Sequence, residues 1–189
     1  MFSAAKRATI NLKNEDDECF KWAITRALYS VETKSEGIHR KLREKSEVLN
    51  WECLKFPVNL IDISKYENRN SLVSVNVFAY QKVVYPHRIS EHNYNRESTV
   101  NILLISDDTK QHYCLIKDIC KLLSLQTSKH GQVQVVCFRC LNTFNSEKLL
   151  ASHHEYCKSH EGIKIELTEK ESKMSFKNQN RSMRLQFIV

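Results

Sequence analysis

Three cysteines and one histidine in the last third of the chain have the spacing of metal ligands. Two residues separate Cys137 from Cys140, twelve separate Cys140 from His153, and three separate His153 from Cys157. The first pair brings two thiolates to one tight turn, and the second pair lies about one helical turn apart on one helix face. Zinc prefers four sulfur and nitrogen ligands in a tetrahedral arrangement. The spacing therefore predicts a Zn2+ site at these four residues.

The residues between these ligands resemble the ββα zinc finger, with cysteine replacing histidine as the fourth ligand. Phe144 and Leu150 occupy the two small apolar core positions of that pattern. A unit of this length buries too little apolar surface to fold alone, so zinc binding of about 10–16 kcal/mol becomes its folding free energy. His154 and His160 are alternative ligands. However, His154 would face a different side of the helix from His153, and His160 would lengthen the final gap.

The predicted metal site leaves the role of the finger open. Fingers that read DNA usually come in arrays, each covering about three base pairs. This sequence holds a single finger. The residues expected to point outward form a weak set for reading bases: Asn145, Glu147, Lys148 and Ser152. A structural or protein-docking role and a nucleic-acid contact both remain as alternatives.

A different cysteine, Cys19, lies where a helix is expected to begin. It follows Asp16 and Asp17 and opens the apolar helical pattern of residues 18–29. The helix dipole and free backbone N–H groups stabilise a thiolate at that position, as a cysteine nucleophile requires. Its general base would be a histidine on a strand packed against the helix. His112 falls within a predicted central strand, and the alternative is that both are ordinary core residues.

The segment DDECFKWAI resembles the nucleophile segment of ovarian tumour (OTU) deubiquitinases. In that family an aspartate lies three residues before the catalytic cysteine, and Asp16 and Cys19 match this spacing. The later HY pair, which begins at His112, matches the closing strand of the family. The resemblance covers roughly residues 8–120. It implies a papain-like cysteine isopeptidase that acts on ubiquitin or a ubiquitin-like protein, with these three residues at its catalytic site.

One position departs from the OTU pattern. The family commonly has Asp or Asn two residues after the catalytic histidine, whereas this sequence has Cys114, and a thiol is a weak hydrogen-bond partner. Asp118 would lie roughly 20 Å further along the strand, at about 3.3 Å per residue. Asp16 or a loop residue is the remaining candidate to orient His112.

Nearly the whole chain also resembles the region preceding the polymerase proper in protein-primed family B DNA polymerases of Maverick/Polinton-type transposable elements. The matching segments include NEDDECFKWAITRAL, VLNWECLKFPV, SVNVFAY, HYCLIK and the finger. The exonuclease and polymerase carboxylates of that family lie beyond these residues. The resemblance therefore implies a truncated copy or an accessory region, whose partner would be nucleic acid or protein.

These patterns predict an α+β fold with three parts. Residues 1–126 form an OTU-like domain in which helices pack on a small mixed or antiparallel sheet, residues 127–160 form the finger, and residues 161–189 form a tail with strands. The net charge of +7 permits contact with nucleic acid but does not require it. No apolar run is long enough to span a membrane, so we expect an intracellular protein of the nucleus or cytoplasm. The predicted helices are at 18–29, 36–49 and 119–126, with a short helix in the segment 56–67, and the predicted strands are at 8–12, 72–80, 81–87, 99–106 and 111–117. A turn is expected at 107–110 and a linker at 127–132.

Overall fold

The computed structural model describes residues 8–29, 36–92, 96–106, 111–127 and 135–159. A five-stranded mixed sheet has the order β1-β5-β4-β2-β3, and a two-stranded sheet pairs β6 with β7. The strands are β1 (Thr9–Ile10), β2 (Val73–Gln81), β3 (Val83–Arg88), β4 (Ser98–Ser106), β5 (Gln111–Ile116), β6 (Val135–Val136) and β7 (Thr143–Phe144). The helices are α2 (Cys19–Leu28), α3 (Arg40–Ser46), α4 (Ile63–Arg69), α5 (Ile119–Thr127) and α6 (Glu147–Cys157), with a 3-10 turn at Leu60–Asp62.

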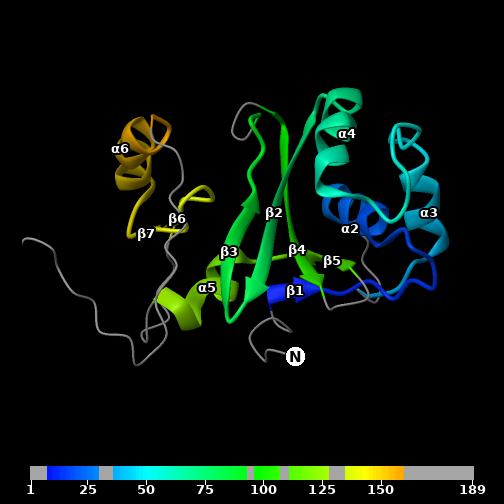
Figure 1. Cartoon of the computed structure of the whole chain (residues 1–189), viewed down its shortest axis with the longest axis horizontal. Helices are drawn as coiled ribbons and strands as arrows, with labels where there is room; N and C mark the ends of the chain where they lie inside the picture. Colours follow the sequence, from blue (N-terminus) through cyan, green and yellow to red (C-terminus); the bar gives the residue numbers. More distant parts are fainter. Residues whose placement is uncertain (1–7, 30–35, 93–95, 107–110, 128–134, 160–189) are drawn as a thin grey trace, which may run out of the picture.

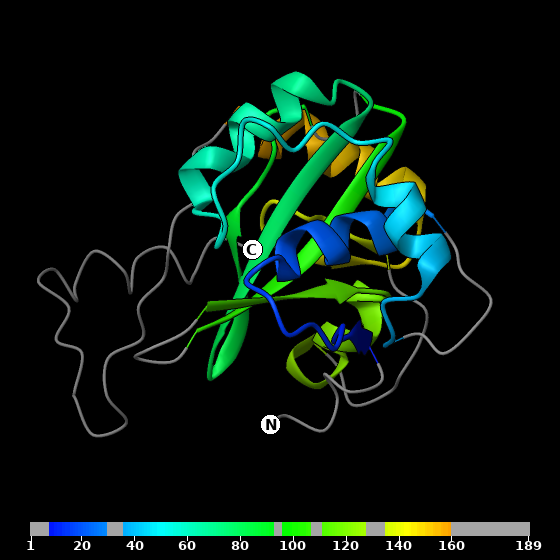
Figure 2. The same cartoon turned by 90° about the vertical axis from the view of Figure 1, so that its right-hand side faces the viewer.

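The large sheet has different elements on its two sides. Figure 1 shows α2, α3 and α4 on one side, and α5 with the finger elements β6, β7 and α6 on the other. Figure 2, viewed from the first side, shows α2 lying across the strands. The sequence predicted an α+β fold with helices on a mixed or antiparallel sheet, and the structure confirms helices packed on a mixed sheet; the OTU-like arrangement stays a prediction.

Strand β4 lies in the interior of the sheet and pairs differently with its two neighbours. It runs parallel to β2, with Val75 opposite Val100, and antiparallel to β5, with Leu104 opposite Tyr113. Successive side chains of a strand point to opposite faces, so β4 needs apolar residues on both. Its Ile102 contacts the core under α2, whereas its neighbour Leu103 belongs to the core on the other face.

The core under α2 is organised by three buried aromatic rings. Phe20 lies edge-on to Tyr66 and to Tyr113, with ring centroids 5.7 and 5.4 Å apart. Edge-to-face pairs stabilise a core by about 0.5–1.5 kcal/mol beyond their buried area. The Tyr113 hydroxyl also donates to the Val58 carbonyl at 3.0 Å, so its one polar atom is satisfied. These contacts fix α2 against β5.

A buried ion pair fixes α4 to the same sheet. The Glu67 side chain is 3% exposed and lies 2.6 Å from the Arg88 guanidinium. Its other oxygen accepts the Val75 N–H at 2.7 Å, while Arg88 donates to the Val75 carbonyl at 2.6 Å. Because every buried charge here has a partner, the cluster is stable only as a complete unit.

The second core joins the sheet to the finger. Phe78, Cys114 and Leu122 are buried there together with Val136 of β6. The partly buried side chains of Phe138 and Leu141 pack against the same cluster. The finger expected as a separate module at residues 127–160 thus shares apolar contacts with the sheet.

Some expected elements differ from those in the structure. The helix expected at residues 36–49 is shorter, Arg40–Ser46, with a β-region residue, His39, at its N-cap. The strands expected in the tail at residues 161–189 lie outside the described residues. The expected turn at 107–110 and most of the expected linker lie outside them as well.

Candidate metal centre

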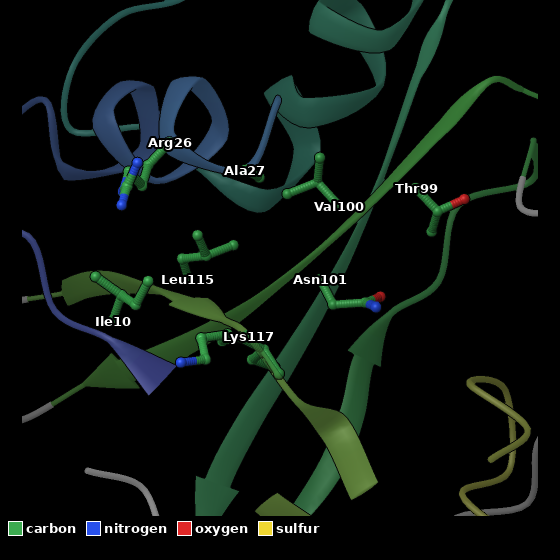
Figure 3. Close-up of a pocket in the computed structure, with 9 residues that line it drawn as sticks. Ile10, Arg26, Ala27, Thr99, Val100, Asn101, Leu115 and Lys117 are labelled. Atoms are coloured by element: carbon green, nitrogen blue, oxygen red, sulfur yellow. The ribbon is translucent and has the colours of Figure 1, made fainter. Parts of the chain in front are cut away.

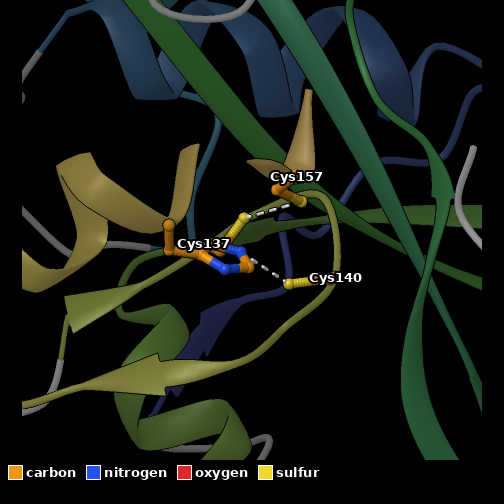
Figure 4. Close-up of side chains that lie close together, drawn as sticks. Cys137, Cys140 and Cys157 are labelled. Atoms are coloured by element: carbon orange, nitrogen blue, oxygen red, sulfur yellow. Dashed lines mark hydrogen bonds between the residues drawn. The ribbon is translucent and has the colours of Figure 1, made fainter. Parts of the chain in front are cut away.

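The four predicted ligands converge on one point. The ligand atoms of Cys137, Cys140, His153 and Cys157 all lie within 4.8 Å of one another. The Sγ atoms of Cys137 and Cys157 are 3.9 Å apart, and Cys140 Sγ is 3.2 Å from His153 Nε2 (Figure 4). Ligands at about 2.0–2.3 Å from one tetrahedral metal ion would be separated by about 3.3–3.8 Å. The cluster therefore fits a single metal ion with little rearrangement.

The hairpin that carries the first two ligands is a tight turn. Leu141 N–H donates to the Cys137 carbonyl at 2.8 Å, and Cys137 N–H donates to the Asn142 carbonyl at 2.9 Å. Leu141 has a φ of 59°, in the left-handed region that a non-glycine residue rarely adopts. The turn aims both thiols at the same side, toward α6.

The helix that carries the other two ligands has a capped start. Ser146 is its N-cap, and the Ser146 hydroxyl accepts the Leu149 N–H at 3.4 Å. This contact satisfies one of the N–H groups that a helix start leaves unpaired. Across the site, the Phe144 ring lies 4.7 Å from the His153 imidazole. The Phe144 ring of β7 thereby packs against the histidine ring.

The thiols of this cluster disfavour ionisation when no cation is near. Burial and the neighbouring Cys137 raise the pKa of Cys140 to about 12. Burial and Cys137 also raise the pKa of Cys157. A bound divalent cation reverses this preference, because it stabilises each thiolate directly. The donor set and its geometry thus meet the requirements of a metal centre.

Of the two alternative histidine ligands, the structure describes only His154. His154 is not part of the convergent group, although it lies next to His153 on α6. His160 lies outside the described residues.

The residues expected on the outer face of α6 are exposed as predicted, namely Asn145, Glu147, Lys148 and Ser152. The apolar Leu149 and Tyr156 are exposed as well. In fingers that read DNA, the residue before the helix and the third and sixth helical residues contact bases. Here those positions hold Ser146, Leu149 and Ser152. None has the bidentate side chain that recognises guanine or adenine. Leu149 is 53% exposed and Tyr156, two turns further along, is 70% exposed.

Cys19 begins α2 as predicted, but its thiol is buried. Its exposed fraction is 5%, and its Sγ accepts the Tyr113 N–H at 3.4 Å. Burial raises the pKa of Cys19, and the charges of Asp16 and Asp17 raise it further, which outweighs the hydrogen bonds from Tyr113 and Phe20. The thiol form dominates at neutral pH, the opposite of an activated nucleophile.

His112 does not meet Cys19. His112 pairs across strands with Ile105, which packs against the second core, so the two side chains share that face. Its neighbour Tyr113 points to the first core, where Cys19 lies. The His112 Nε2 lies 2.6 Å from the Asn11 Oδ1, the geometry of an imidazole N–H donating to an amide oxygen. Burial alone accounts for the lowered pKa of His112.

Asp16 organises the turn before α2. Its carboxylate accepts Asn14 Nδ2 at 2.8 Å, Glu18 N–H at 3.0 Å and Trp22 Nε1 at 3.2 Å. Burial would raise the pKa of Asp16, but these hydrogen bonds outweigh it and lower the pKa. Among the described residues, the hydrogen bonds of its carboxylate thus lie within the turn and the first helical turns, and none is with His112.

Cys114 and Asp118, which follow His112 in the sequence, both have structural contacts. Cys114, where the OTU pattern has Asp or Asn, is 1% exposed, and burial raises its pKa to about 12. Asp118 accepts the Lys121 N–H at 2.9 Å near the start of α5. The structure therefore brings together the four metal ligands but not the three residues proposed for catalysis.

Comparisons with known proteins give no relative. No family model, curated protein or solved structure matches the chain. Among the described residues, no helix combines the length and apolar character needed to cross a membrane.

Proposed function

We propose that this chain is a non-enzymatic docking module whose finger is folded around one Zn2+ ion. The single observation that carries the proposal is the convergence of three thiols and one imidazole within 4.8 Å. Sulfur-rich tetrahedral sets select zinc among the common divalent ions. All four ligands come from the protein, so the ion has no open position for substrate and its role is structural.

The alternative predicted from the sequence, an OTU-like isopeptidase, has less support. Its mechanism requires His112 to remove the proton from Cys19 during attack on a carbonyl. The two side chains belong to opposite faces of the sheet, and the Cys19 pKa is raised. A ubiquitin derivative with an electrophilic C-terminus tests this directly. We expect no adduct on Cys19 in the zinc-loaded chain, and stoichiometric labelling that Cys19→Ala abolishes would reinstate the hydrolase.

We further propose that α6 contacts a protein rather than DNA bases. The three base-reading positions carry two serines and Leu149, and the exposed Leu149 and Tyr156 are spaced to lie on one side of the helix. Tyrosine is enriched among the residues that anchor protein interfaces, and the exposed Leu149 adds apolar surface on the same side of the helix. The resemblance to the region preceding Maverick/Polinton-type polymerases supports the exonuclease–polymerase segment of such an enzyme as the partner.

The test measures binding of that exonuclease–polymerase segment to the zinc-loaded chain by calorimetry. We expect the Leu149→Ala, Tyr156→Ala double variant to weaken binding at least tenfold, because each anchor contributes more than about 1 kcal/mol. Lys148→Ala, on the same exposed helix, is the matched control and should bind as the parent does. If the double variant and Lys148→Ala weaken binding equally, the face that carries Leu149 and Tyr156 is not the binding surface. Tight binding of duplex DNA with preference for one sequence would favour the nucleic-acid alternative.

A further inference from the structure

A cavity of about 390 Å³ lies away from the metal centre, between the end of α2 and the start of β4. Figure 3 shows Arg26 and Ala27 of α2 above it, Leu115 of β5 at one side, and Asn101 of β4 at the other. None of the residues predicted to be functional lines it. The cavity is therefore separate from the metal centre and from the residues proposed for catalysis.

The cavity exists because β5 covers only part of β4. β5 pairs with β4 from Ile102 to Ser106, whereas β2 pairs with it from Ser98 to Leu104. Beyond β5 the chain turns away, and the N–H groups of Lys117 and Asp118 both donate to the Ala8 carbonyl. Within the described part of the chain, residues 98–101 consequently pair with a strand on one side only. This leaves about 13 Å of strand edge, at about 3.3 Å per residue, next to the cavity.

An unpaired strand edge of this kind accepts another strand. Its free N–H and C=O groups are a template for an extended peptide, which supplies the missing backbone hydrogen bonds. Because β4 is an interior strand, its open end is bounded by α2 and β5 rather than exposed along its whole length. Only a short segment can enter.

The charges around the cavity select the peptide. Arg26 and Lys117 line it, and none of the lining residues is acidic. The Lys117 side chain is exposed and forms no ion pair among the residues that the structure describes. The apolar part of the lining comes from Ile10, Ala27, Val100, Leu115 and Ile116. Arg26 belongs to α2, and Lys117, directly after β5, has the same parity as Leu115, so both cations lie on the α2 side. Ile116, in contrast, belongs to the core on the other face. A strand that alternates acidic and β-branched residues can direct its acidic side chains to the α2 side and its β-branched side chains to the other face.

We propose that this cavity is a docking site for a short acidic β-strand of a partner protein, which pairs with residues 98–101 of β4. Its backbone continues the sheet where β5 ends, and its carboxylate contacts Lys117 and Arg26. A free organic anion could contact the two cations but could not pair with the strand edge. The experiment distinguishes these two occupants.

The probe is an array of fluorescein-labelled hexapeptides that alternate Asp with Val, Ile, Thr or Tyr, measured by anisotropy with the zinc-loaded full chain. We expect saturable binding by a subset, and about tenfold weaker binding when Asp is replaced by Asn or when the protein carries Lys117→Glu. Lys41→Glu, an exposed lysine of α3, makes the same change in net charge and should leave affinity within a factor of two.

Backbone pairing has its own readout. N-methylation of alternate peptide residues blocks one edge of the strand, so one set of alternate positions should abolish binding and the other should preserve it. Absence of binding across the array would overturn the proposal. If Lys117→Glu and Lys41→Glu weaken peptide binding equally, the binding is general electrostatic attraction to the chain, and the proposed docking site is overturned. Equal binding of both N-methylated forms would leave an anion site without strand pairing.

Discussion

Removal of zinc should destabilise the side of the sheet that lies furthest from the finger. The finger contributes Val136, 4% exposed, to the second core, and Phe138 and Leu141 pack against it. Burying one valine side chain stabilises a fold by about 1.5–3 kcal/mol. If the finger unfolds without its metal, at least this contribution is lost. At about 2–4 °C per kcal/mol for a chain of this size, the melting temperature should fall by about 3–12 °C.

Tryptophan fluorescence is the appropriate assay, because neither of the two tryptophans lies in the finger. Trp22 packs with Leu12 and Leu42, and Trp51 packs against the core under α2. A melting curve followed by tryptophan emission thus reports on the face opposite the metal centre. We expect the midpoint to fall when a zinc chelator is added and to recover when zinc is restored.

Two cysteine variants provide the controls for this experiment. Cys140→Ser removes a ligand, so it should have the lower midpoint already and respond little to the chelator. Cys53→Ser lies outside the finger and should keep the full response of the parent. An unchanged tryptophan midpoint after complete zinc removal would refute the reasoning, because it would mean that the finger and the sheet unfold independently.

Three further predictions concern the sheet domain. Cys19 in the folded chain should react with iodoacetamide at pH 8 more slowly than in the urea-unfolded chain, because its raised pKa lowers the thiolate fraction; faster reaction when folded would point to activation. Glu67→Gln should cost about 3–5 kcal/mol in urea unfolding, since it leaves Arg88 buried beside a neutral group, whereas Glu36→Gln at an exposed pair should cost at most about 1 kcal/mol. The lowered pKa of Asp16 stabilises the fold above the unfolded value of 3.8, and this contribution is lost as pH falls below that value and through the folded pKa. Asp16→Asn should therefore flatten the pH dependence of the free energy of unfolding below about pH 4, and identical acid profiles for parent and variant would contradict this.

The metal centre could be predicted from the sequence because each half of the site comes from one short segment of the chain. Cys137 and Cys140 share one turn, and His153 and Cys157 share one helix face, so spacing alone specifies both halves of the site. The small core that joins the halves is also local. No long-range contact had to be known to place the four ligands together.

The position of His112 could not be predicted in the same way. Alternation along β5 is clear, but both of its faces are apolar, with Tyr113 and Leu115 on one and Cys114 and Ile116 on the other. A strand buried on both faces gives no signal for which face a helix covers. The aromatic ring of Tyr113 packs against Phe20 of α2, and this long-range contact directs the imidazole to the other face.

Two other long-range features were also hidden from the sequence. The parallel pairing of β2 with β4 depends on β3 returning along the outer edge of the sheet, which is a property of topology rather than of local pattern. The contact of Val136 with the second core likewise joins residues far apart in the chain. The exposure of Leu149, in contrast, could have been anticipated from its place at the third helical position.

X-ray absorption at the zinc edge on the purified chain tests the central claim most directly. The account predicts one zinc ion per chain, with three sulfur neighbours at about 2.3 Å and one nitrogen neighbour at about 2.0–2.1 Å. Cys157→Ser should reduce the sulfur count by one. A zinc shell dominated by oxygen and nitrogen in the parent chain, or a folded finger that retains no zinc, would contradict it.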